Sequence, residues 1–187
     1  MSLKLTASLA AAALPLAATA APESFTVDPY HSIPYFEVVH LNTSVIRGRF
    51  EKVTGRMTLD SAAKTGSIEL SIPTATLSTG DNDKGSRPRS RDEHLRSPDF
   101  FNVAEFPMMT YKGKATKFSG DHPAVIEGEL TLLGVTKPVT LTVERWNCGP
   151  DPRSQGKRYF IHHDPIRSYW FRNVLDSLLA LIVIGQC

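Results

Sequence analysis

Apolar and polar residues alternate along most of the chain that follows Phe25. In the segment YFEVVH, Phe36 and Val38 fall on one face of an extended strand, while Tyr35 and Glu37 fall on the other. The same period of two recurs in later segments, at 48–60, 67–72, 109–111, 126–132 and 139–144. Sequences rich in Gly, Pro, Asp and Lys separate these segments and are typical of turns. The pattern predicts about seven or eight strands, each with one polar face.

Strands of this kind must bury their apolar faces, either between two packed sheets or inside a closed barrel. The segment 91–111 is the exception to the alternation. Ser90 or Asp92 can cap a short helix there, and Ser97 can start a further turn. We therefore expect one or two short helices around residues 92–103 at one end of an all-β protein. Aromatic residues of this segment would plug or gate that end, namely Phe100, Phe101 and Phe106.

Residues 1–20 have the pattern of a removable secretory signal. Lys4 supplies a positive start, residues 5–16 form an apolar segment rich in Ala and Leu, and residues 18–20 give an A-x-A cleavage site. No Cys follows that site, so we do not expect a lipoprotein anchor. We expect the mature chain, residues 21–187, to be one exported domain without a transmembrane segment, in the periplasm of a Gram-negative host.

The composition is that of an ordinary globular domain, with 187 residues, 41% hydrophobic, and 21 Lys and Arg against 19 Asp and Glu. A net charge of +2 gives no general attraction to polyanions, and we expect no nucleic-acid partner. Basic residues gather in KGSRPRSR, where Arg87 and Arg89 can meet a diphosphate or an anionic head group. Acidic and basic residues balance between positions 80 and 99, so a solvated loop is the default expectation there.

No pattern in the sequence predicts catalysis or a metal site. The chain has 6 His and 2 Cys, but no His pair has i, i+2 or i, i+4 spacing. Motifs such as G-x-S-x-G, H-E-x-x-H and the phosphate loop do not occur. Cys148 and Cys187 can form one disulfide in an oxidising compartment or remain free. We expect a binding protein without a metal or a cofactor, and an unrecognised enzyme ranks last.

Several segments, in the same order, resemble the signatures of the YceI family of periplasmic polyisoprenoid-binding proteins. They are DPYHSIPYFEVVH at 28–40, GRF at 48–50, HLRSPDFFNVAEFPMMTY at 94–111 and IEGELTLLGVTKPVTL at 126–141. The resemblance covers about residues 25–146 and implies an extended eight-stranded antiparallel barrel, similar to a lipocalin. It also implies a lumen that holds a long polyisoprenoid, such as a quinone tail or a prenyl lipid, for transport, storage or stress response.

Inward-facing residues of such a barrel would contact the isoprenoid tail. Met side chains adapt to irregular shapes, and each buried methylene group contributes about 0.8 kcal/mol, so a long tail needs no polar contact. Arg87, Arg89 and Tyr111 are secondary candidates for a head group. The residues expected to line the lumen are Phe36, Val38, Met57, Leu59, Ile68, Leu70, Ile72, Met109, Tyr111, Leu130, Leu132, Leu141 and Val143. The same alternation fits a barrel filled by its own side chains, and then the protein would be a stress-linked periplasmic interaction protein that binds no lipid.

The resemblance weakens from about residue 147. Residues 178–184 are continuously apolar, whereas a closing strand with one face in water should be polar at every second position. A partner in a homodimer or a membrane could cover this run, a shift in reading frame could have produced it, or it could form a short helix. The unusual C-terminal segment therefore leaves the closure of the barrel open.

Overall fold

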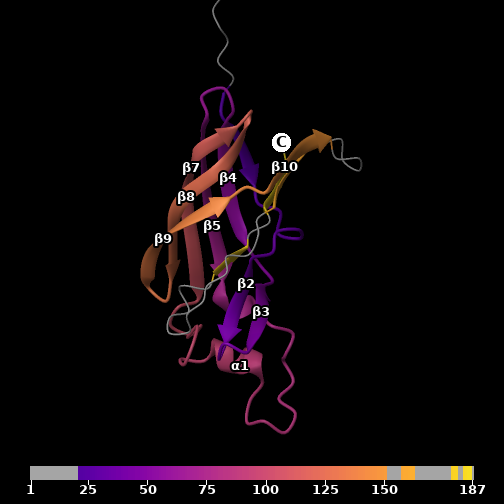
Figure 1. Ribbon diagram of the computed structural model, residues 1–187, viewed down its shortest axis with the longest axis vertical. Coiled ribbons are helices and arrows are strands. Elements are labelled where there is room, and N and C mark those ends of the chain that lie inside the picture. Colours follow the sequence, from indigo (N-terminus) through magenta and orange to yellow (C-terminus); the bar gives the residue numbers. More distant parts are fainter. Residues whose placement is uncertain (1–20, 151–156, 163–177, 181–182, 187) are drawn as a thin grey trace, which may run out of the picture.

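The computed structural model describes residues 21–150, 157–162, 178–180 and 183–186, and Figure 1 shows them as a body built almost entirely from strands. The expected secretory signal at 1–20 lies outside the described residues. So does Cys187, which leaves the disulfide with Cys148 a prediction.

The largest sheet has six strands in the order β1-β4-β5-β7-β8-β9, and every neighbouring pair is antiparallel. Its strands are β1 Glu23–Thr26, β4 Thr54–Asp60, β5 Thr65–Pro73, β7 Met108–Ser119, β8 His122–Leu132 and β9 Val135–Thr142. From β4 to β5 and from β7 to β9, the connections are tight turns, which fixes the register of each pair.

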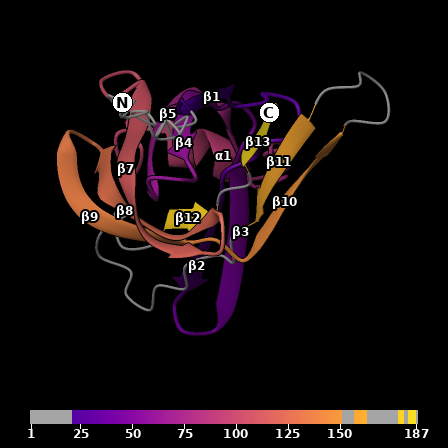
Figure 2. The same ribbon diagram turned by 90° about the horizontal axis from the view of Figure 1, so that it is seen from above.

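Two smaller antiparallel sheets accompany the six-stranded one. The order β12-β2-β3-β6 joins β12 Leu178–Ala180, β2 Tyr35–His40, β3 Ser44–Phe50 and β6 Leu77–Ser78. The order β10-β11-β13 joins β10 Arg145–Pro150, β11 Lys157–His162 and β13 Val183–Gln186. Figure 2, seen along the length of the body, shows these sheets around a common interior. Within the described ranges the three sheets are not joined into a closed barrel.

The prediction of an antiparallel all-β protein with very little helix is confirmed, whereas an eight-stranded closed barrel is not confirmed. The described residues of the apolar C-terminal run 178–184, which are 178–180 and 183–184, lie in strands β12 and β13. In those residues the helical alternative is therefore wrong. The sequence pattern could not separate the two because a short apolar run suits a buried strand and a buried helix equally well.

The six-stranded sheet shows why the alternation predicts its two faces. In β5, Ile68, Leu70 and Ile72 are at most 2% exposed, and the residues between them point to the outer face. On that outer face, Glu69 lies opposite Lys112 of β7, and their side chains form an ion pair of 3.6 Å. Cross-strand pairs of opposite charge favour this register, and the dry face packs into the core.

A short helix, α1 (Arg91–Arg96), lies at one end of the body (Figure 1). Ser90 is its N-cap, and a capping box forms because the Ser90 hydroxyl accepts from the N–H of Glu93 while the Glu93 carboxylate accepts from the N–H of Ser90. Of the two predicted caps, Ser90 is confirmed. The second turn, from Ser97 to Phe101, does not form a helix. It is held by backbone bonds such as the one from Phe101 N–H to the Leu95 carbonyl (2.9 Å).

Candidate ligand-binding interior

The residues predicted to line a lumen come together in one apolar cluster. All of them are buried except Val38 and Val143, which are partly buried and pack against the cluster. The cluster takes side chains from the six-stranded sheet and from the β2–β3 hairpin, so it lies between these two sheets. The structure therefore groups the predicted residues, and their contact with a ligand remains a proposal.

Strand pairing arranges the buried side chains in rows across the six-stranded sheet. Leu70 of β5 lies opposite Tyr111 of β7, and Tyr111 lies opposite Leu130 of β8. In the neighbouring row, Ile72 lies opposite Met109. Rows of large apolar side chains on adjacent strands give the inner face a continuous apolar surface.

Tyr111 carries the polar atom at the centre of this surface. Its hydroxyl donates to the carbonyl oxygen of Val139 at 3.1 Å and lies 3.3 Å from that of Ile126. A Cβ at Gly113 would lie 2.8 Å from the Tyr111 hydroxyl, and one at Gly128 would lie 2.8 Å from the ring. The ring therefore lies close to the backbone of Gly113 and Gly128, where a larger residue would not fit. Burial raises the pKa of Tyr111, and the charge of Glu127 raises it further, so the hydroxyl stays protonated.

An aromatic cluster fills the interior beside α1. The rings of Phe36, Phe50 and Phe101 contact each other with centroids 5.7 to 6.1 Å apart, and each residue is at most 2% exposed. A Cβ at Gly48 would lie 2.2 Å from the Phe36 ring, so glycine is needed for the ring to lie against β3. Among the predicted aromatic residues, Phe101 packs into the body as a plug does. Phe100 instead stacks edge-on against His94 with centroids 4.8 Å apart.

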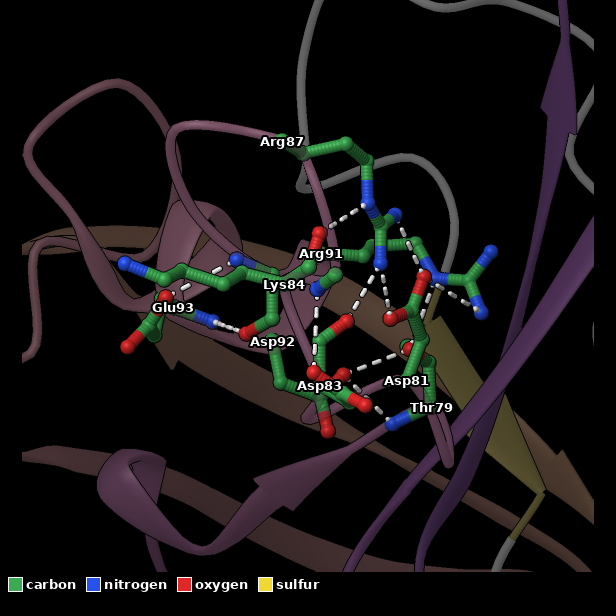
Figure 3. A network of polar contacts seen from close by, with 10 residues as sticks. Thr79, Asp81, Asp83, Lys84, Arg87, Arg91, Asp92 and Glu93 are labelled. Atoms are coloured by element: carbon green, nitrogen blue, oxygen red, sulfur yellow. Dashed lines mark hydrogen bonds and ion pairs between the residues drawn. The ribbon is translucent and has the colours of Figure 1, made fainter.

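The basic loop before α1 is paired with its own acidic residues (Figure 3). Both terminal nitrogens of Arg87 donate to Asp81, at 2.8 and 2.6 Å. Arg91 donates to the Thr79 hydroxyl, and the buried Asp92 accepts from the N–H and the hydroxyl of Thr79 at 2.9 and 2.5 Å. Hydrogen bonding from Arg87 holds the pKa of Asp81 below its ordinary value and outweighs the opposing effect of burial.

A second ion pair joins the end of this loop that precedes α1 to the segment that follows α1. Arg89 donates to Asp99 at 2.7 Å, and a ring nitrogen of His94 lies 3.1 Å from the same carboxylate. The Arg89 hydrogen bond is the main reason that the pKa of Asp99 lies below its ordinary value. Arg87, Arg89 and Tyr111 were the secondary head-group candidates. Arg87 and Arg89 pair with nearby carboxylates, which favours the solvated, self-paired loop over a head-group site. The Tyr111 hydroxyl is bonded to a backbone carbonyl of the sheet.

Two histidines of the described residues, His31 and His122, have partners within the fold. His31 lies 2.8 Å from the carboxylate of Asp28, within a turn where the N–H of Tyr30 also donates to Asp28. Burial raises the pKa of Asp28, but these hydrogen bonds outweigh it and leave that pKa below its ordinary value. His122 stacks on Trp146 with centroids 5.7 Å apart. In the part of the chain that the structure describes, no group of His, Cys, Asp and Glu is arranged to hold a metal ion.

The predicted lining residues leave out several members of the apolar cluster. They are Phe25, Val27, Phe50, Val53, Leu77 and Ile126. Ile126 could have been found, because it shares the alternation of Leu130 and Leu132 in β8. Leu77 could not, since β6 has only two residues and shows no periodicity. Searched over the described residues, the structure has no helix of the length and apolarity needed to cross a membrane.

Fold and interior together define a small antiparallel β protein whose sheets enclose one apolar core. The chain belongs to the YceI-like family, because the YceI-like domain matches residues 25–162. This match runs past residue 147, where the motifs weaken, and includes β10 and β11. A UPF0312 protein of Shewanella denitrificans is 36% identical over 140 residues, which cover 74% of this chain and 70% of that protein. A Vibrio cholerae UPF0312 protein is 32% identical with the same coverage.

Solved structures share the fold at lower sequence identity. The Campylobacter jejuni YceI protein superposes with a TM-score of 0.60 at 21% identity, over 81% of this chain and 91% of that one. A polyisoprenoid-binding domain from Saccharophagus degradans, implicated in plant cell wall breakdown, gives a TM-score of 0.52 at 15% identity, over 87% and 97% of the chains. These similarities support the antiparallel architecture described above.

Proposed function

We propose that this protein binds the tail of a polyisoprenoid, such as an isoprenoid quinone or a prenyl lipid, in the apolar interior between its sheets. The observation that carries the proposal is the largely apolar surface that the rows through Leu70, Tyr111 and Leu130 form across β5, β7 and β8. Membership of the YceI-like family supports it, as does the solved relative described as a polyisoprenoid-binding domain.

The chemistry of the interior suits a tail and not a head group. From β5 to β8 the polar side-chain group of the row through Leu70 and Leu130 is the Tyr111 hydroxyl, and backbone carbonyls already accept its hydrogen. On β9, Lys137 lies opposite Leu130 and continues this row. A guest in contact with these rows gains only by removing its own apolar surface from water, at about 0.8 kcal/mol for each buried methylene group. Affinity would then grow with the length of the tail, and selectivity would depend on the length and width of the interior.

In this proposal the strands β10 to β13 complete an enclosure around the tail, as in a closed barrel. The protein acts by binding and releasing its ligand, without covalent chemistry, metal or cofactor. It works in the periplasm after export, where a water-insoluble lipid needs a carrier or a store. Residues Val38 and Val143 are the predicted lining residues with partial exposure, so they would lie where a tail enters.

The competing function is a self-filled body that contacts a protein partner. The observation in its favour is the tight aromatic cluster of Phe36, Phe50 and Phe101, which occupies one end of the interior without a guest. A solid interior of that kind would give no affinity for isoprenoids. The two functions therefore separate on a binding measurement.

Binding of a series of prenyl alcohols with increasing numbers of isoprene units tests the proposal directly. We expect affinity to rise with each unit until the interior is filled. Val38→Phe and Val143→Phe should each weaken binding, because added bulk at partly buried positions occupies the space of the tail while the fold tolerates it. Glu69→Ala, a change on the outer face of β5, should have no effect. An affinity that does not depend on chain length would refute the proposal.

A further inference from the structure

The tip of the β2–β3 hairpin is apolar and exposed. Leu41 is 77% exposed and Val45 46% exposed, and Val45 lies opposite Val39 in the ladder. Between His40 and Arg47 the chain carries no charged residue. Figure 2 shows the hairpin reaching outward from the body. An antiparallel strand pair with one packed face normally has a polar outer face, and here the outer pair is Val39 and Val45.

The backbone of this tip is unusual for the residue it carries. Leu41 has a φ of 52° and Asn42 a φ of 54°, which is the left-handed pair of a type I′ turn. Asn and Gly favour this conformation, whereas a branched apolar side chain is strained in it. Both the N–H and the hydroxyl of Thr43 donate to the His40 carbonyl, so the turn satisfies its own polar groups.

The β8–β9 hairpin provides the matched case within the same chain. Its turn also begins with a leucine in the left-handed region, Leu133 with φ 53°, followed by Gly134 with φ 71°. Leu133 is partly buried and packs against the apolar core, so packing offsets its strain. Leu41 is strained in the same way and has little packing in the folded chain. Residues in strained backbone conformations persist where a function requires them.

Side chains on the outer face of the hairpin change in order from its tip to its base. The apolar pair Val39 and Val45 is followed by Glu37 opposite Arg47, and then by Tyr35 opposite Arg49. The Arg47 side chain is 69% exposed, although it donates to Glu37 at 2.5 Å. Because a strand rises about 3.3 Å per residue, Arg47 lies roughly 13 Å behind the tip. From the tip to the base, the hairpin therefore carries apolar residues first and then cations and a tyrosine. Elements that enter a lipid surface have this order.

We infer that the β2–β3 hairpin docks this protein on a phospholipid surface by inserting Leu41, Val39 and Val45 among the acyl chains. A protein partner fits less well, because these few side chains at a convex tip offer far less than the roughly 800 Å² per partner of a stable interface. Arg47 and Arg49 would lie at the level of the lipid phosphates. The inference does not depend on a hollow interior, although a carrier of water-insoluble lipid would need such a contact.

Sedimentation with vesicles of phosphatidylethanolamine and phosphatidylglycerol tests the docking. The full chain should sediment with the vesicles, and Leu41→Asn should weaken the affinity for the vesicles roughly tenfold, since it removes one inserted leucine. Asn suits a positive φ, so this variant should fold at least as well as the parent chain. Leu133→Asn is the matched control, because it makes the same change in the other turn and should leave vesicle binding unchanged. Adding Val45→Thr to Leu41→Asn should reduce binding further.

Three results would overturn the inference. They are a parent chain that stays in solution, equal binding by the parent and Leu41→Asn, and dimers that Leu41→Asn dissociates in the absence of vesicles. Retention of a prenyl alcohol by the same variants separates this inference from the proposed function. Leu41→Asn should still retain the alcohol, so a loss of docking alone leaves the lipid-binding proposal standing.

Discussion

Strand β5 and the β2–β3 hairpin belong to the same antiparallel body but differ in how their sequences meet their surroundings. In β5 each apolar residue is buried and its polar neighbours face outward. In the half of the hairpin nearest its turn, the outer pair Val39 and Val45 is apolar, and the exposed Leu41 lies in the turn itself. In β5, packing of the core explains which residues are apolar. At the hairpin tip, core packing does not explain the apolar residues, and such departures from local structural rules are commonly found at functional sites.

The largest expected effect comes from shortening a side chain in the buried rows. Leu70→Ala should lower the free energy of unfolding by about 2 to 5 kcal/mol, because Leu70 is 2% exposed and the change leaves a cavity. Val45→Ala in the hairpin should change it by about 0.5 kcal/mol or less, as an exposed position does. Urea unfolding of the two variants measures both values. Similar losses in the two would remove the distinction between the regions.

The loop before α1 should depend on the buried carboxylate of Asp92 more than on its partly exposed ion pair between Asp81 and Arg87. Asp92→Ala should cost about 1 to 3 kcal/mol, since it leaves the N–H and the hydroxyl of Thr79 without their acceptor. Asp81→Ala removes the partly exposed partner of Arg87, whose own side chain is half exposed, and should cost clearly less. Thermal unfolding of both variants compares them. An equal or larger loss for Asp81→Ala would show that the Asp81–Arg87 pair contributes as much to the loop as the buried Asp92.

A smaller effect is expected from acid. The pKa values of Asp81 and Asp99 lie below their ordinary value of 3.8 in the folded protein, chiefly through Arg87 and Arg89. Near and below pH 3.8 the unfolded chain then binds more protons, so this stability is present above that pH and is lost as the pH falls through the lower folded values. The urea concentration at the unfolding midpoint, measured at several pH values in this range, should fall with decreasing pH. It should fall less steeply for the double variant Arg87→Gln, Arg89→Gln than for the parent chain. An identical slope would contradict the role of these pairs.

The smallest effect sharpens the comparison of the two leucine turns. Leu41→Asn should raise the free energy of unfolding by a few tenths of a kcal/mol to about 1 kcal/mol, because Asn fits the left-handed region and little packing is lost. Leu133→Asn relieves the same strain but gives up core packing, so it should destabilise the protein. The melting temperatures of the two variants, compared with that of the parent chain, show the sign of each change in stability. Destabilisation by both would mean that Leu41 is packed in solution.

The sequence was most informative where local rules decide the structure. Alternation predicted the two faces of β5, and Ser90 was one of the two caps predicted for the start of α1. It was least informative where distant residues meet. Nothing near Tyr111 in the chain indicates that its hydroxyl reaches the Val139 carbonyl or that its ring needs glycine at position 128.

The division of the strands into sheets was equally hidden from sequence reasoning. Alternation marks which face of a strand is dry, but it does not say which strands pair or whether the last one closes a barrel. The buried phenylalanine at position 50 lies at the end of β3 and meets Phe101 from a segment far along the chain. Contacts of that kind come from the fold as a whole, so the lining residues could be predicted as a group while their partners could not.

The central claim is that the apolar interior holds an isoprenoid tail, and mass spectrometry of an organic extract tests it most directly. The full chain would be purified without detergent, beside the double variant Val38→Phe, Val143→Phe. We predict a prenyl lipid in near-equal molar amount with the parent chain and a strong reduction in the variant, with both proteins folded. A parent chain that is fully stable and yields no isoprenoid would contradict the account and favour the self-filled interaction protein.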